Sequence, residues 1–412
     1  MAKYLFELGR IPDISIAELN SLLGEENLVG TVEHFALYEI KKTILNSRTA
    51  QSFQDRLGGT IRSAEIVAEF PLKGQKLEEL KSKIETSLEE VLTDHFKDRS
   101  GKIPFALTAI NIPDNPKVFL KFFLNFSKKI LKSLGFNSRF VNKPWSNPTS
   151  AQIYKSGSVS KGIDLIIIGG NDILYIAKTV SIQNIDKYSY RDYEKPFRDA
   201  RMGMLPPKLA QIMINLAEPS PSRTNQIIFD PFCGSGTILM EAMLQGKDAI
   251  GSDIDKKAVE GTTENLYWLT RKFENTPKEF VIFQKDAQEI IEKDFPLMPD
   301  AIVTETHLGP PVSRIPTEEN LRKTFENLTS LHLNWLSGIA KIIPPKTRIV
   351  LCLPAFKKAK SSYIYFPDFE SIAKETGFRV INRSDSATKK PLIYDRPDQI
   401  VAREIVVLEK FS

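Results

Sequence analysis

Three acidic residues and a glycine-rich turn occupy positions at which a nucleotide-like ligand would be held. An apolar run ends at Asp230, and the turn that follows contains Phe232, Cys233, Gly234, Gly236 and Thr237. Asp253 follows a second apolar run, 23 residues after Asp230, and Asp286 follows a third. Glycines let a backbone turn tightly and approach a ligand, and free amides at a helix start can hold an anion. The pattern predicts a ligand with a ribose and an anionic group.

The spacing of these residues favours one class of nucleotide-like ligand over the others. A carboxylate at Asp253 can accept hydrogen bonds from both ribose hydroxyls, and Asp286 can accept one from an adenine amino group. A dinucleotide fingerprint needs Gly or Ala three positions after Gly236, where this chain has Leu239, and no Gly-Lys-Ser/Thr phosphate loop occurs. S-adenosylmethionine therefore fits best, with its carboxylate at the helix start. The alternative is that these acids only cap helices and contact solvent.

Strand and helix patterns alternate from Leu205 onward. Such an alternation is needed to bring the three acidic residues and the glycine-rich turn to one place. This rhythm predicts a mainly parallel, doubly wound α/β sheet, in which residues after the strands line one crevice. The last apolar run, Ile405–Leu408, is expected as an edge strand. The predicted elements are 208–217, 227–229, 238–244, 249–252, 256–270, 280–283, 301–304, 317–340, 348–353, 369–376 and 379–382.

The N-terminal part has a different pattern and a basic charge. Residues 1–70 mix short strands with helices, and 165–168 and 173–177 predict a hairpin, which together indicate an α+β region. Residues 101–212 contain 17 Lys and Arg against seven Asp and Glu. Several lysines lie on a predicted amphipathic helix, 117–134, whose basic face can follow a phosphate backbone. An ordinary solvated helix face explains the same charges.

Composition narrows the class of protein. Of 412 residues, 42% are apolar and 26% charged, which is ordinary for globular chains. Two cysteines exclude a disulfide scaffold and fit a reducing compartment, and four scattered histidines give no metal-binding spacing. The start lacks a signal-peptide pattern, and no run is long and apolar enough to span a bilayer. We expect a soluble, cytoplasmic protein with neither a metal nor a membrane contact.

These motifs resemble those of a known family. Asp230-Pro231-Phe232-Cys233-Gly234-Ser235-Gly236-Thr237 is similar to the cofactor motif of class I methyltransferases that modify exocyclic amines of nucleic-acid bases. Most of the chain resembles the THUMP-domain tRNA guanosine-N2 methyltransferases, on stretches 4–23, 56–61, 191–210 and 396–405. The resemblance implies a ferredoxin-like part at 1–65, a THUMP-like RNA-binding domain at 66–182, a linker at 183–203 and a Rossmann-like methyltransferase domain at 204–412. The first two parts would hold the tRNA acceptor end.

One motif departs from that family. Its members usually end the fourth strand with Asp-Pro-Pro-Tyr, whose Asp and a main-chain carbonyl bind the target amine while the ring stacks on the extruded base. This chain has Glu305-Thr306-His307-Leu308 there. Glu305 keeps a carboxylate, and His307 can stack if the loop shifts by one residue, so both are candidate catalytic residues. Alternatively, the loop has lost its chemistry and only stiffens the fold.

The sequence therefore predicts an S-adenosylmethionine-dependent RNA methyltransferase that acts on the N2 amine of a guanosine in tRNA. Glu305 would orient the amine by position and charge, without first removing its proton. Two alternatives stay open: a DNA or protein amino-methyltransferase, and an RNA-binding protein that keeps the pocket without transferring methyl groups. The sequence leaves open which base and atom are modified, the oligomeric state and any activating partner.

Overall fold

The computed structural model describes residues 1–41, 44–45, 48–97, 102–198, 204–218, 226–274, 276–277, 279–359, 362–381 and 390–411. The chain divides into two compact units. Unit 1 comprises Met1–Pro12 and Leu23–Lys187, and unit 2 comprises Asp13–Leu22 and Tyr188–Ser412.

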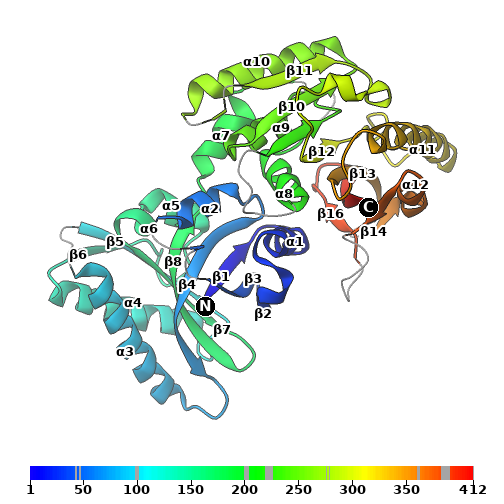
Figure 1. Ribbon diagram of the computed structural model, residues 1–412. Coiled ribbons are helices and arrows are strands. Elements are labelled where there is room, and N and C mark those ends of the chain that lie inside the picture. Colours follow the sequence, from blue (N-terminus) through cyan, green and yellow to red (C-terminus); the bar gives the residue numbers. More distant parts are fainter. Residues whose placement is uncertain are drawn as a thin grey trace. The chain divides into compact units, whose positions relative to one another are not determined.

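The described part of unit 1 is built on one eight-stranded mixed sheet, in the order β2-β3-β1-β4-β8-β7-β5-β6 (Figure 1). The pairs are antiparallel except that β5 runs parallel to β6 and β7. The antiparallel β7–β8 pair confirms the predicted hairpin. The strands are β1 (Ala2–Leu8), β2 (Leu28–Val32), β3 (Phe35–Ile40), β4 (Thr60–Pro71), β5 (Lys102–Ile110), β6 (Asn137–Phe140), β7 (Ile163–Gly169) and β8 (Ile173–Ile182).

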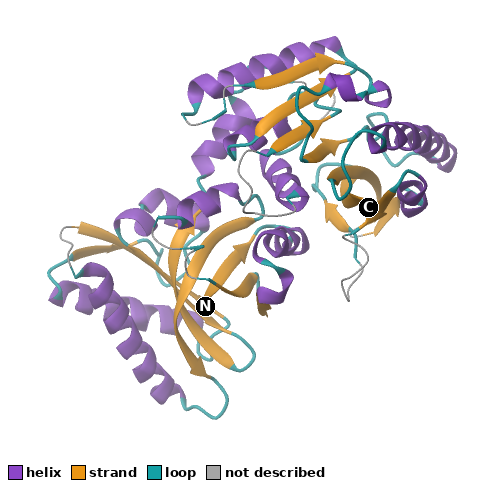
Figure 2. Cartoon of the chain, in the orientation of Figure 1, coloured by secondary structure: helices purple, strands orange, loops and turns teal. Residues whose placement is uncertain are grey.

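Two long helices of unit 1 cover one part of this sheet. Apolar residues of α3 and α4 form a core cluster with β5, β7 and β8, in agreement with the α+β region expected from the sequence. Figure 2 shows both helices beside the strands. The helices of unit 1 are α2 (Ala50–Arg56), α3 (Leu77–Phe96), α4 (Pro116–Ser133), α5 (Ser150–Ser156), α6 (Ser158–Lys161) and the 3-10 turn η1 (Glu25–Asn27).

Helix α4 carries a basic stripe on its exposed side. Its start is fixed by Asn115, whose side chain accepts hydrogen bonds from the backbone amides of Lys117 and Val118. Exposed lysines stand at four positions that share a sector of about 60° at 3.6 residues per turn. They are Lys117, Lys121, Lys128 and Lys132, called here the α4 lysine stripe.

A buried ion network connects the central strands of unit 1. Arg62 on β4 contacts Glu7 on β1 and donates to Asp164 on β7 at 2.7 Å. All three side chains are less than a tenth exposed. One arginine thus neutralises two buried carboxylates, which would otherwise be strongly destabilising.

We expect Arg62→Met to lower the free energy of unfolding by about 3–5 kcal/mol, because it leaves two buried carboxylates without their cation. Urea unfolding of the full chain, followed by circular dichroism, measures this loss. Arg139→Met, at an exposed position of β6, is the control and should stay within about 0.5 kcal/mol of the wild type. Equal effects of the two substitutions would contradict the role assigned to the network.

Unit 2 contains the predicted doubly wound sheet. Its main path is β11-β10-β9-β12-β13-β17-β15, and the first five strands of that path run parallel. Apolar runs form these strands because helices cover both faces of the sheet. The strands are β9 (Ile227–Asp230), β10 (Asp248–Asp253), β11 (Phe280–Gln284), β12 (Ala301–Glu305), β13 (Arg348–Ala359), β14 (Ser362–Tyr365), β15 (Phe378–Val380), β16 (Leu392–Tyr394) and β17 (Val401–Lys410).

The expectation of an edge position for the last strand is wrong. β17 pairs antiparallel with β13 on one side and with β15 and β16 on the other. Its residues 402–408 are all buried, as is typical of an interior strand with both faces covered. The apolar run was visible in the sequence, but its place in the strand order depends on long-range pairing.

Different helices cover the two faces of this sheet. Side chains of α9 and α10 form one cluster with Ala249 of β10, whereas α11 and α12 pack with the neighbouring residue Ile250. Alternate residues of a strand point to opposite faces. The helices of unit 2 are α8 (Pro207–Ala217), α9 (Thr237–Leu244), α10 (Lys256–Lys272), α11 (Glu318–Ala340) and α12 (Phe369–Glu375), with the 3-10 turns η2 (Ala287–Glu289) and η3 (Glu292–Asp294).

Two helices, α1 and α7, lie near or within the predicted domain boundaries. α1 (Pro12–Leu23) follows β1 in the chain, yet most of it belongs to unit 2, where Ser21 donates to the Asn215 carbonyl at 2.8 Å. α7 (Ile185–Tyr193) lies within the predicted linker. Linker residues 199–203 and Asn382 of the predicted strand 379–382 lie outside the described residues. The four-part division at 1–65, 66–182, 183–203 and 204–412 stays a prediction.

Candidate functional site

Asp230 stands where the strand order of unit 2 reverses. β9 lies between β10 and β12, and such a switch point opens a crevice at the carboxyl ends of the strands. Asp230 ends β9 and is 1% exposed. One carboxylate oxygen accepts hydrogen bonds from the Phe232 amide at 3.1 Å and from the Thr304 hydroxyl at 2.7 Å. Burial raises the pKa of Asp230 to about 7, and these two donors oppose the shift.

The turn after Asp230 needs its glycines. Gly234 and Gly236 have φ of 53° and 75°, in the left-handed region that favours glycine. A Cβ at Gly236 would lie 2.8 Å from the Thr262 side chain, so nothing larger fits there. A Cβ at Gly234 would meet only the Phe232 carbonyl oxygen, at 4.0 Å. The turn therefore has free space beside Gly234, and α9 starts at Thr237 immediately after it.

Asp253 and Asp286 lie at the same edge of the sheet. Asp253 ends β10 and accepts from the Gly234 amide at 2.9 Å, which joins it to the turn. The Lys285 amide, next to Asp286, donates to the Asp253 carbonyl at 3.0 Å. Asp286 accepts from the Gln288 amide at 2.9 Å and so also caps η2. The structure thus brings the three predicted acids to one edge.

Two of the predicted cofactor residues have side chains that pack into the fold. Cys233 is 5% exposed in the cluster of α9 and α10, and burial raises its pKa well above the usual range. Phe232 packs edge-to-face on Trp335, with ring centroids 5.7 Å apart. Any contribution of these two residues to ligand binding would come mainly from the backbone of the turn.

Glu305 has a partner that sequence reasoning missed. It ends β12, and Arg403 from β17 reaches across β13 to form an ion pair with it. The side chain of Glu305 is 19% exposed and that of Arg403 is 5% exposed. Burial raises the pKa of Glu305, and the charge of Arg403 opposes this shift. The signal in the sequence is a charged pair, Arg403-Glu404, between the apolar residues Val401-Ala402 and Ile405–Leu408 of this strand.

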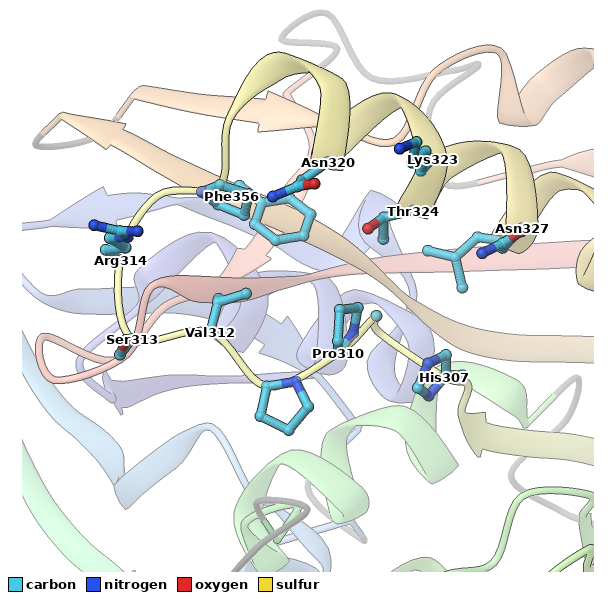
Figure 3. Close-up of a pocket in the computed structure, with 14 residues that line it drawn as sticks. His307, Pro310, Val312, Ser313, Arg314, Asn320, Lys323, Thr324, Asn327 and Phe356 are labelled. Carbon is cyan, nitrogen blue, oxygen red and sulfur yellow. The ribbon is translucent and has the colours of Figure 1, made fainter.

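A pocket with a volume of about 530 Å³ opens beyond β12. Figure 3 shows the loop from His307 on one side of the pocket and residues of α11 on the other. Gly309, with φ of 96°, lets the loop approach α11, because a Cβ there would lie 2.8 Å from Thr324. The lining residues are His307, Gly309, Pro310, Pro311, Val312, Ser313, Arg314, Pro316, Asn320, Lys323, Thr324, Asn327, Leu328 and Phe356.

The predicted catalytic residues thus have different surroundings. His307 is exposed and lines the pocket, whereas Glu305 lies two residues earlier, at the strand end. Lys195, which lies in the predicted linker 183–203, is buried and donates to the Thr237 hydroxyl at 2.9 Å. Local spacing could not predict this contact, because Lys195 precedes Ser235 of the turn by 40 residues in the chain.

Neither a metal site nor a membrane span is found in the part of the chain that the structure describes. Within those residues, no group of three or more His, Cys, Asp or Glu side chains is arranged to hold a metal ion. The described helices are also too short or too polar to cross a membrane.

Comparisons with known proteins find methyltransferases. A family described as "DNA methylase" matches residues 104–264, less than half of the chain. The tRNA (guanine(10)-N2)-dimethyltransferase of Methanothermobacter thermautotrophicus is 34% identical over 172 residues, 41% of this chain and 46% of that protein. A probable tRNA (guanine(10)-N2)-dimethyltransferase of Methanothermococcus thermolithotrophicus is 32% identical over 125 residues, 29% of this chain and 70% of that protein.

Coverage of other relatives is partial. The Pyrococcus abyssi tRNA (guanine(10)-N2)-dimethyltransferase is 28% identical, and the match covers 52% of each chain. The chain thus spans about half the length of this relative and of the Methanothermobacter protein. Among solved structures, TrmN from Thermus thermophilus matches 99% of this chain and 100% of its own, with 16% identity and a TM-score of 0.48.

Asp230→Asn tests the buried carboxyl group at the switch point. The pKa of Asp230 in the fold is about 7, against an ordinary 3.8, so the folded protein holds a proton that the unfolded chain releases. Stability from this group is present near pH 4 and is lost as the pH rises through 7. We expect the unfolding free energy of the wild type, relative to Asp230→Asn, to fall by about 4 kcal/mol between pH 4 and pH 8. Urea unfolding at several pH values measures this difference, and a pH-independent difference would contradict the assignment.

Proposed function

Because the chain belongs to the family of tRNA (guanine(10)-N2)-dimethyltransferases, we propose that it transfers methyl groups from S-adenosylmethionine to the N2 amine of a guanosine in tRNA. The observation that carries this proposal is the position of Glu305 at the switch point. It ends the strand next to β9, so the cofactor turn and the carboxylate that would meet the amine stand at adjacent strand ends. A cytoplasmic location and tRNA as the partner are parts of the same proposal.

The residues at the edge fit the cofactor. The space beside Gly234 allows close approach of the ligand to the backbone, and the start of α9 offers amides for its carboxylate. Asp253 would accept from the ribose hydroxyls, and Asp286 from the adenine amine. Ile254, which is 66% exposed between these acids in the chain, would offer an apolar surface to the base.

Glu305 would act on the amine by position and charge. When bound, S-adenosylmethionine would supply an electrophilic methyl group. The bond from methyl carbon to sulfur would break as the bond from nitrogen to carbon forms, which leaves a neutral thioether, and the nitrogen would then release a proton to water. Arg403 fixes one oxygen of Glu305, which leaves the other oxygen to accept from the amine. A positive charge that develops on the nitrogen is stabilised by a carboxylate held in advance.

The pocket beyond β12 would receive the target base. An extruded base is usually held by stacking and by hydrogen bonds to its edge. His307 would provide the stacking surface, and the side chains of Asn320, Thr324 and Asn327 provide hydrogen-bonding groups along α11 (Figure 3). Arg314 and Lys323, at the same pocket, would meet the phosphates on either side of the base.

The α4 lysine stripe would contribute to tRNA binding in unit 1. Two of its lysines lie over aromatic rings: Lys121 is 5.7 Å from the ring centre of Trp145, and Lys128 is 5.6 Å from that of Phe140. These contacts hold cations in a row while their charges stay exposed. A row of cations suits a phosphate backbone, and assignment of this part of the chain to a THUMP-like domain belongs to the same proposal.

Incubation of the full chain with labelled S-adenosylmethionine and unmodified tRNA tests the function. We propose that label enters tRNA and that nucleoside digestion recovers it as N2-methylated guanosine. Label in duplex or single-stranded DNA instead would favour the activity suggested by the DNA methylase family that matches residues 104–264. Cofactor binding by calorimetry without transfer to any nucleic acid would favour the binding protein.

Glu305→Gln should lower the turnover rate about 100- to 1,000-fold, because it keeps the shape of the side chain and removes the charge that faces the amine. Cofactor affinity, measured by calorimetry, should change less than about threefold. Asp286→Asn is the matched control: it keeps the cap of η2 and should weaken cofactor binding with little effect on turnover at saturation. Unchanged turnover in Glu305→Gln would exclude the proposed role.

Replacement of the four lysines of the α4 stripe by Gln should weaken tRNA binding and make it less dependent on salt. Each lost phosphate contact reduces the slope of log affinity against log salt concentration by about 0.7–0.9. Filter binding of tRNA at several salt concentrations measures the slope. The matched control replaces four exposed lysines of unit 2; an equal loss in both variants would contradict a specific role for the stripe. These control residues are Lys293, Lys341, Lys346 and Lys374.

A further inference from the structure

Lys195 is a buried cation at the start of α9. The residue is 4% exposed, and its ammonium group donates to the Thr237 hydroxyl at 2.9 Å and lies 3.4 Å from the Ser235 hydroxyl. Among the described residues, its hydrogen-bond partners are thus hydroxyls rather than carboxylates. A buried lysine without a paired anion is expensive to keep.

The position of Lys195 at a helix start raises the free-energy cost of burying its charge. Thr237 is the first residue of α9, and the N-terminal end of a helix carries a partial positive charge that disfavours a cation. Burial lowers the pKa of Lys195 to about 8, while the charges of Asp192 and Glu241 oppose this shift. Glu241 is itself paired with Arg191 at 2.7 Å. The ammonium group and the helix end together form a positively charged corner beside the glycine turn.

The segment that carries Lys195 is fastened to this corner. The side chain of Asn265 accepts from the Phe197 amide at 2.9 Å and donates to the Phe197 carbonyl at 3.0 Å. The side-chain amide of Asn265 also donates to the Ser235 carbonyl at 2.9 Å, and this bond links the segment to the turn. Gly261 makes room for Phe197, because a Cβ there would lie 2.2 Å from the ring. Lys195 is therefore held in advance at the turn.

We propose that Lys195 binds the carboxylate of the methionine part of the cofactor. This inference rests on the proposed function and adds a residue from outside the turn. A carboxylate at this corner would meet an ammonium group and the amides of a helix start together, which offsets the cost of burying the lysine. Lys195 thereby distinguishes ligands that carry the amino-acid end from nucleosides that lack it.

Calorimetry with two ligands tests the proposal. S-adenosylhomocysteine carries the amino-acid end, and 5′-methylthioadenosine is the related nucleoside thioether without it. Lys195→Met should weaken the first ligand about tenfold or more, as expected for a lost charged contact, and the second less than about twofold. Lys208→Met is the control, since Lys208 is a lysine of the same unit whose ammonium group lies over the Tyr188 ring, 5.0 Å from its centre. It should leave both affinities within about twofold.

The other outcomes separate this inference from the proposed function. Equal loss of both ligands in Lys195→Met, or loss of neither, would overturn the inference while the function stands. Failure of the wild type to bind either ligand would overturn the proposed function, and the inference with it. Thermal denaturation without ligand gives a second measurement: Lys195→Met and Lys195→Gln should melt no lower than the wild type, because both remove a buried cation. Lower melting temperatures in both would instead assign Lys195 a structural role.

Discussion

The partial burial of several carboxylates at one sheet edge is the constraint on which the candidate site depends. Asp230, Asp253 and Glu305 end three neighbouring strands, and the charges of the other two add to the rise in the pKa of Asp230. Asp230 is held by a hydroxyl and an amide, Asp253 by the amide of the glycine turn, and Glu305 by a full charge from Arg403. These donors differ in strength, so the three acids can have different tasks.

The order of the elements in unit 2 was predictable because it follows from local patterns. The apolar runs before Asp230 and Asp253 predict buried strands, and parallel strands must place the residues that follow them at one edge. The helix of residues 117–134 and the hairpin after Gly169 were predicted for the same reason, since their signals lie within a few residues. Neighbouring residues decide each of these features.

What could not be predicted depends on pairing across the chain. The interior position of β17 follows from its pairing with β13 and β15, and only that position brings Arg403 to Glu305, 98 residues away. Lys195 lies in the predicted linker and donates to Thr237, which is 42 residues further along the chain. α1 likewise packs in unit 2, although it lies between strands of unit 1. Spacing within a motif carries no information on such contacts.

The two cations at the edge explain how one crevice can hold acids with different roles. Arg403 is bound to Glu305 within the fold, so the charge of this pair is balanced whether or not a ligand is present, and the carboxylate keeps its orientation. Lys195 has only hydroxyl hydrogen-bond partners among the described residues, so an arriving anion would be the first to bond to its ammonium group directly. A site with one satisfied and one unsatisfied cation directs a ligand's negative end to the turn. With the carboxylate at the turn and the adenine at Asp286, the sulfonium would lie between them, where the negative charge of Glu305 suits a positively charged centre.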